Sequence, residues 1–139
     1  MRNSSSFPKK EKLVSRKLID RLFVGGGSKS MSCFPLRLVF MVLDHNDEAL
    51  ENKGSHEDMA DAQMLISVPK RCFKHAVDRN RVKRQVREAY RCHRDLYNIP
   101  EGSYLAMAFI WLDHQHHDTA EVEDKVVNLL RRMGEKLAR

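Results

Sequence analysis

The chain has 139 residues, a length typical of one domain that buries its own hydrophobic core without the help of disulfide bonds. Its 25 Lys and Arg residues outnumber its 19 Asp and Glu residues and leave a formal net charge of +6. This positive excess favours an anionic partner, with nucleic acid ahead of an acidic membrane surface or an acidic protein.

Two features argue against a secreted or membrane-spanning protein. The three cysteines, Cys33, Cys72 and Cys92, are odd in number and form no CxxC pair, so the sequence predicts neither a disulfide framework nor a zinc site. The basic N-terminus lacks the apolar core of a signal peptide, and no apolar run approaches the roughly 20 residues that span a bilayer. We therefore expect a cytoplasmic protein without a membrane partner.

The first third of the chain predicts an arm, a helix and a strand. Residues 1–11 are typical of a flexible basic arm. Residues 13–23 predict an amphipathic helix, because apolar residues recur there four positions apart. The glycine-rich tract at 24–30 ends this helix and is typical of a flexible hinge. Residues 33–43 are rich in β-branched and aromatic side chains and predict a strand with Pro35 near its start.

The remainder of the chain predicts a loop, two strands and two helices. Residues 44–62 carry seven carboxylates against a single lysine and predict a long acidic loop. A short buried strand follows at 64–68, and a basic helix then ends near Tyr97. The apolar run at 103–112 predicts a central strand buried on both faces. Residues 118–137 predict the last helix.

The last helix has both a start signal and an apolar stripe. Asp118, followed three residues later by Glu121, resembles a capping box. The stripe is formed by five residues at helical spacing: Val122, Val126, Leu129, Leu130 and Met133. The order of the elements predicts a small two-layer α+β sandwich with helices on a sheet.

The basic helix sorts its residues onto two sides at about 100° per residue. One side is predicted to face the sheet and holds Val82, Val86, Ala89, Tyr90 and His93. The adjacent side holds Asn80, Lys83, Arg84, Arg87, Arg91 and Arg94, with Arg79 on the border and Arg81 pointing away. Glu88 is the only anion between Arg79 and Arg94. Because like charges four residues apart are mutually unfavourable, this row indicates a binding surface rather than an ordinary solvated face.

Arginine dominates the row, and its planar guanidinium suits phosphate because it donates two hydrogen bonds at once. Three further cations precede the helix and could extend the surface. The residue pattern therefore predicts an RNA- or DNA-binding face on an α+β domain. Its candidate residues are Lys70, Arg71, Lys74, Arg79, Asn80, Arg81, Lys83, Arg84, Arg87 and Arg91.

The segment RNRVKRQVRE, residues 79–88, resembles the RNR motif of the bacterial ribonuclease P protein family. The family pattern RNRxKRxxRE matches at Arg79, Asn80, Arg81, Lys83, Arg84, Arg87 and Glu88. The flanking segments ISVPKR, KEKLVSRKLIDRLFVGG and YLAMAFIW also fall where the family has a basic turn, a first helix and a strand. The resemblance covers most of the chain from Lys10 to Leu137.

This resemblance implies a fold and a division of labour. The fold would be one domain over residues 1–139, with three helices, a mixed sheet of about four strands and a left-handed β-α-β crossover. The chain would be the protein subunit of ribonuclease P, which removes the 5′ leader of precursor tRNA, and its basic motif would dock on the RNA subunit. The resemblance implies no catalytic or metal-binding residue in this chain, no cofactor bound by the protein alone, and Mg²⁺ in the RNA holoenzyme. A cleft would receive the leader, with Phe23, Phe34 and Phe40 as candidates, and no obligate protein partner is evident.

Two alternatives remain open on the sequence. One is a non-catalytic RNA-binding module, such as a ribosomal protein or an RNA chaperone. The other is a metal-dependent nuclease built on the segment DHQHHD, because histidines and carboxylates can hold a metal. That segment contains Asp113, His114, His116, His117 and Asp118, but its spacing matches no established metal motif. A polar turn that leads into the last helix is the plainer interpretation.

Overall fold

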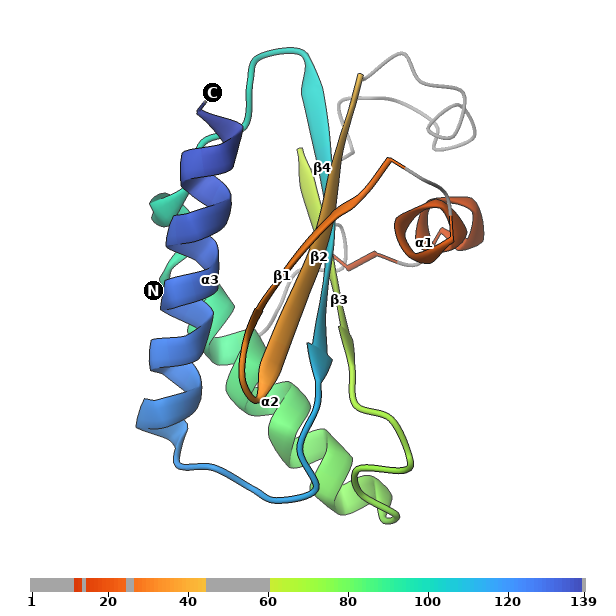
Figure 1. Cartoon of the computed structure of the whole chain (residues 1–139), viewed down its shortest axis with the longest axis vertical. Helices are drawn as coiled ribbons and strands as arrows, with labels where there is room; N and C mark the ends of the chain where they lie inside the picture. The colour runs from red at the N-terminus through yellow and green to blue at the C-terminus, as the bar shows by residue number, and fades with distance from the viewer. Residues whose placement is uncertain (1–11, 14, 25–26, 45–60, 139) are drawn as a thin grey trace, which may run out of the picture. The chain divides into compact units, whose positions relative to one another are not determined.

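The computed structural model describes residues 12–13, 15–24, 27–44 and 61–138. Along the chain it has α1 (Arg16–Phe23), β1 (Lys29–Cys33), β2 (Leu36–Asp44), β3 (Ala62–Ser67), α2 (Ala76–Cys92), the short 3-10 helix η4 (Arg94–Leu96), β4 (Ser103–Trp111) and α3 (Thr119–Leu137) (Figure 1). The predicted arm at 1–11 and residues 45–60 of the predicted acidic loop lie outside the described residues.

The four strands form one mixed sheet in the order β1-β2-β4-β3. β3 and β4 are neighbours in this sheet although α2 lies between them in the sequence, which is the connection of a β-α-β unit. The prediction of an α+β fold with three helices and about four strands is confirmed. β4 is an inner strand, and seven of its nine residues are buried. Its continuous apolar run therefore reflects burial on both faces, as predicted.

The structure corrects the predicted elements at three places. β1 lies partly in the tract that was predicted to be a hinge, and its sequence KSMSC gave no strand signal because Met31 is its only buried residue. A turn at Phe34 and Pro35, which are joined by a cis peptide bond, separates β1 from β2. The basic helix ends at Cys92, earlier than predicted, and η4 follows it.

The chain divides into two compact units, and the first contains residues up to Ser30, Val39–Leu65 and Ile99–Ala108. In this unit the Ser15 hydroxyl accepts a hydrogen bond from the Leu18 backbone N–H at 3.4 Å and caps α1. Leu18 and Leu22 are fully buried, which confirms the apolar face predicted for α1. The prediction of one domain over the whole chain stays a prediction.

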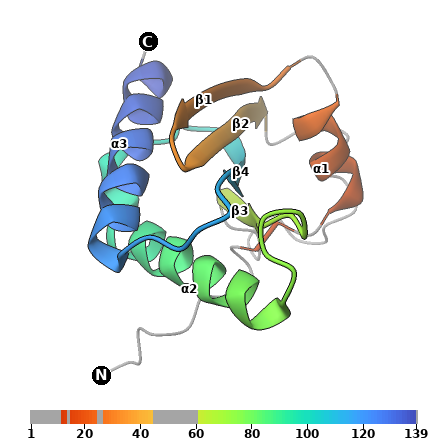
Figure 2. The same cartoon turned by 60° about the horizontal axis from the view of Figure 1, so that its bottom comes forward.

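The second unit contains Met31–Leu38, Ile66–Asn98 and Phe109–Arg139, and α2 packs against α3 within it (Figures 1 and 2). The predicted stripe of α3 is confirmed, since all five of its residues are fully buried. At the end of α2 the hydroxyls of Tyr90 and Tyr97 lie 2.7 Å apart and share a hydrogen bond. No helix in the described part of the chain combines the length and the apolar character that a membrane crossing needs.

Candidate nucleic-acid interface

α2 presents the two sides that its sequence predicts. Val82, Val86, Ala89 and Tyr90 are buried, while His93 is half-buried at the end of the helix. The helix also buries Gln85, which the prediction did not include. The buried side fixes the rotation of α2 about its axis, so the cations between Arg81 and Arg87 must lie away from the core.

Eight of the predicted binding residues form what we call the basic surface: Lys70, Arg71, Lys74, Asn80, Arg81, Lys83, Arg84 and Arg87. Lys83 and Arg87 are half-exposed and the other six are exposed. Within the described part of the chain, none of their side chains makes a hydrogen bond or an ion pair. The seven positive charges of this surface are therefore available to an anionic partner.

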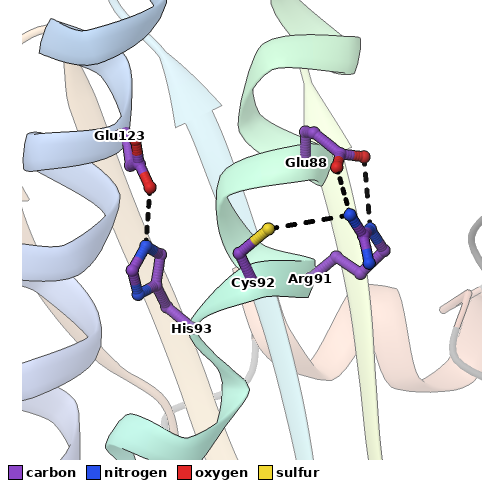
Figure 3. A network of polar contacts seen from close by, with 5 residues as sticks. All are labelled: Glu88, Arg91, Cys92, His93 and Glu123. Atoms are coloured by element: carbon purple, nitrogen blue, oxygen red, sulfur yellow. Dashed lines mark hydrogen bonds and ion pairs between the residues drawn. The ribbon is translucent and has the colours of Figure 1, made fainter. Parts of the chain in front are cut away.

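The C-terminal end of α2 differs, because two side chains there, Arg91 and His93, have protein partners (Figure 3). Arg91 forms an ion pair with Glu88, in which its Nε donates to Glu88 Oε2 at 3.2 Å. The hydrogen bond from Arg91 lowers the pKa of the Glu88 carboxyl, and the same bond raises the pKa of Arg91. His93 Nε2 lies 2.7 Å from Glu123 Oε2 and so links α2 to α3. Arg91 thus carries a partly neutralised charge.

Arg79, the first arginine of the RNR segment, is also bound within the protein. Its Nη1 donates to the backbone carbonyls of Phe73 at 3.0 Å and Lys74 at 2.9 Å. These carbonyls belong to the turn before α2. That turn is closed by a hydrogen bond from the Cys72 N–H to the Pro69 carbonyl at 2.9 Å. The arginine therefore joins the first turn of α2 to the segment that precedes it.

Cys72 and Phe73 are the inward-facing residues of this turn. The Cys72 thiol contacts the Trp111 carbonyl at 3.7 Å, and burial raises the pKa of the thiol, so it stays protonated. The Phe73 ring stacks on the His116 ring with centroids 4.4 Å apart and 16° between the planes. His116 Nε2 in turn lies 3.1 Å from Asp78 Oδ1 in the first turn of α2. The DHQHHD segment therefore packs against the start of the basic helix.

His117 is the centre of a second cluster in the same segment. Its Nε2 lies 2.7 Å from Asp113 Oδ2, and its Nδ1 lies 2.9 Å from Glu121 Oε2. The hydrogen bond to Asp113 raises the pKa of His117, with Glu121 adding to the effect against the desolvation that opposes it. The same bond lowers the pKa of Asp113. Gln85 donates from Nε2 to the His117 carbonyl at 3.1 Å, which ties this cluster to α2.

The capping-box prediction is wrong in its contacts. Asp118 occupies the N-cap position of α3, but its side chain makes no capping hydrogen bond. Glu121 pairs with His117 instead. His116 thus contacts one carboxylate and stacks on Phe73, whereas His117 contacts two carboxylates. Among the described residues, no three His, Cys, Asp or Glu side chains gather in a group that could hold a metal ion.

We expect His117→Gln to lower the thermal midpoint by a few degrees near pH 6 and by less at higher pH. The raised pKa of His117 means that its charge stabilises the folded chain fully below about pH 6.5, the unfolded value. This contribution is lost as the pH rises through the higher folded value. Melting curves of both proteins between about pH 5.5 and pH 8.5 test this expectation. His114→Gln is the control, because His114 is exposed; a difference that grows with pH would contradict the assignment.

The three predicted cleft aromatics have different surroundings. Phe23, at the end of α1, is 45% exposed, and Phe34, in the turn between β1 and β2, is 59% exposed. The rings of Phe34 and His117 form a T-shaped pair with centroids 6.5 Å apart. Phe40 is only 2% exposed and packs in the core of its unit. Phe23 and Phe34 therefore offer rings to a ligand, whereas Phe40 does not.

The sequence prediction did not include Gln85 or the contact between Phe73 and His116, and only Gln85 could have been found from the sequence pattern. Gln85 lies three residues after Val82 and four before Ala89, so its helical position could have revealed that it faces inward. The contact between Phe73 and His116 joins residues more than 40 positions apart. No spacing rule covers such a pair, and only the folded chain brings these rings together.

The chain is similar to ribonuclease P proteins in its match to a family model, in its sequence and in its structure. Residues 7–134 match the family model described as Ribonuclease P. Ribonuclease P protein components from two strains of Porphyromonas gingivalis are each 36% identical to the chain over 129 residues, covering 91% of the chain and 85% of the relative. The solved structure of the RNase P protein from Thermotoga maritima is similar with a TM-score of 0.63 and 24% identity, over 88% of this chain and 96% of that one. This structural likeness supports the fold.

Proposed function

The chain belongs to the ribonuclease P protein family, and we propose that it binds the RNA subunit of ribonuclease P through its basic surface. Membership makes the chain a protein subunit of a tRNA-processing ribonucleoprotein. The observation that carries the proposal is a row of cations on α2 that lie in the family's RNR motif and have no hydrogen-bond or ion-pair partner among the described residues: Arg81, Lys83, Arg84 and Arg87. Arg91 adds to this row with a charge that Glu88 partly neutralises.

The basic surface suits a folded RNA for two physical reasons. Guanidinium groups donate paired hydrogen bonds to phosphate oxygens. Each phosphate that a cation neutralises also releases counterions from the RNA, which favours binding and makes it sensitive to salt. Cations on one side of a helix could reduce the repulsion between the RNA subunit and an approaching precursor tRNA. The protein would thus contribute positioning and electrostatic screening to the reaction.

We propose that the 5′ leader of precursor tRNA binds to the exposed aromatic residues. A single strand can stack its bases on aromatic rings without regard to sequence. Phe23 and Phe34 have the exposed rings that such stacking needs. Phe40 is buried, and we propose that it packs β2 in place and does not contact the leader.

We place the catalytic centre in the RNA subunit, with Mg²⁺ bound there. The donor groups of the described residues do not fit a metal site in this chain, so we derive no step through a protein-bound ion. The described side chains would therefore act by binding and orienting the two RNAs. We further propose a cytoplasmic location, which the three free thiols support.

The proposal predicts that efficient cleavage of precursor tRNA needs both components. At low millimolar Mg²⁺ we expect the protein alone to show no cleavage, and the RNA subunit alone to cleave at least about tenfold more slowly than the mixture. The physical reason is that positioning and screening raise the rate only when the catalytic RNA is present. A gel assay of leader release, with the three reactions run in parallel, measures this difference.

His116→Ala provides the control for a protein-based nuclease. Cleavage by the protein alone that this variant abolishes would contradict the proposal and support a nuclease built on DHQHHD. Tight RNA binding without any stimulation of a competent RNA subunit would favour a non-catalytic RNA-binding module instead. Stimulation that survives in His116→Ala supports the role of the RNA subunit as catalyst.

A further inference from the structure

The turn from Pro69 to Lys74 has two buried side chains and three exposed cationic side chains. Cys72 and Phe73 are 6% and 8% exposed. Lys70, Arg71 and Lys74 are exposed, and no described residue forms an ion pair with them. The turn is closed by the N–H groups of Cys72 and Phe73, which both donate to the Pro69 carbonyl. Its buried side thus anchors it, and its outer side carries three cations.

Two connections fix this turn to the start of α2. In the first, both hydrogen bonds come from one amino group, Arg79 Nη1, to the carbonyls of Phe73 and Lys74. Such a group has two N–H donors, so the two carbonyls use both of them. In the second, Phe73 stacks on His116, which contacts Asp78 of α2. Arg79 therefore contacts the turn directly, and the neighbouring Asp78 is linked to it through His116.

We propose that Arg79 is a positioning residue: it holds the turn so that Lys70, Arg71 and Lys74 extend the basic surface beyond the start of α2. This inference rests on the proposed RNA-binding function. It separates Arg79 from Arg84 and Arg87, whose side chains have no partner among the described residues. A lysine at position 79 would keep the charge, but its ammonium lies one bond closer to the backbone than Arg79 Nη1 and ends a flexible chain, so it would not reach both carbonyls in the same way.

Two substitutions that keep the charge distinguish positioning from direct contact. We expect Arg79→Lys to weaken binding of the RNA subunit about tenfold, because the three cations of the turn lose their common orientation. Arg84→Lys, the matched control, should weaken binding by about threefold or less, because it keeps a point charge that phosphate accepts. Filter binding between about 50 and 200 mM salt gives both the affinity and its salt slope. Wild-type binding by Arg79→Lys would overturn the inference.

A double-mutant cycle tests whether Arg79 acts through the turn. In the wild-type background Lys74→Ala should reduce the salt slope by about one, the value for one lost phosphate contact. In the Arg79→Lys background the same change should have less than half of this effect, because Lys74 is already displaced from its position in the turn. A reduction of the salt slope by about one in both backgrounds, as independent effects would give, would overturn the inference. General loss of stability does not produce this coupling in the salt slope.

A measurement on the unaltered chain covers the case in which Arg79→Lys fails to fold. Arginine modification by a dicarbonyl reagent, read by mass spectrometry, reports which guanidinium groups the RNA covers. RNA should protect Arg84 strongly and leave the reactivity of Arg79 within about twofold of its value in the free protein, since its Nη1 donors are already engaged. Protection of Arg79 equal to that of Arg84 would contradict the inference. If wild-type protein fails to bind the RNA subunit at all, the proposed function fails first, which is a separate result.

Discussion

Replacing Lys83, Arg84 and Arg87 together by alanine is expected to weaken binding to the RNA subunit by about a hundredfold or more and to flatten its salt slope by about three. All three lie on α2 without a described partner, so each can neutralise a phosphate. The thermal midpoint should change by less than about 3 °C, because alanine suits a helix and the three side chains lie outside the core. Binding titrations at several salt concentrations, with melting curves, measure both effects.

The matched control removes three cations elsewhere. Lys17, Arg131 and Lys136 are exposed residues of α1 and α3. Their joint replacement by alanine changes the net charge equally and should weaken binding by less than about tenfold. If this control weakens binding as much as the α2 variant, only the net charge matters and the proposed surface is wrong. If the α2 variant unfolds, its cations support the fold instead.

Gly134→Ala is expected to destabilise the chain by about 2 kcal/mol, although the same change inside a helix usually stabilises by about 1 kcal/mol. An added Cβ at position 134 would lie 2.6 Å from the Leu96 carbonyl oxygen and 3.4 Å from Tyr97 Cα. Both are backbone atoms, so α3 and η4 would have to move apart. That movement would also disturb the hydrogen bond between Tyr90 and Tyr97, which closes the end of α2. Denaturant unfolding followed by circular dichroism measures the loss.

Gly27→Ala is the control for this prediction. An added Cβ at Gly27 would have no atom within 4 Å, so the substitution should change stability by less than about 0.5 kcal/mol. An unchanged or raised stability of Gly134→Ala would show that α3 does not approach η4 as closely as the structure indicates. Equal losses in both variants would point to a general effect of the added methyl group rather than to the contact with Leu96.

The sequence predicted the elements that a repeating pattern specifies. α3 was found from its five apolar residues at helical spacing, and β4 from an apolar run that only a strand buried on both faces tolerates. β1 was missed because a short strand with one buried residue has no such pattern. The charged side of α2 could also be predicted, since helical geometry alone separates Val82 and Val86 from Lys83 and Arg87.

Local patterns by themselves determined the three α-helices and the strands β2, β3 and β4, which side of α2 is charged, and, through the RNR motif, the family. The tertiary structure decided how individual side chains of that motif are used. Arg79 and Arg84 are both arginines of the RNR motif, yet of the two only Arg79 donates to two carbonyls of the preceding turn. The His117 cluster likewise combines a loop, α3 and a side chain of α2. Spacing along the chain carries no information about such contacts, because they form only when distant segments pack together.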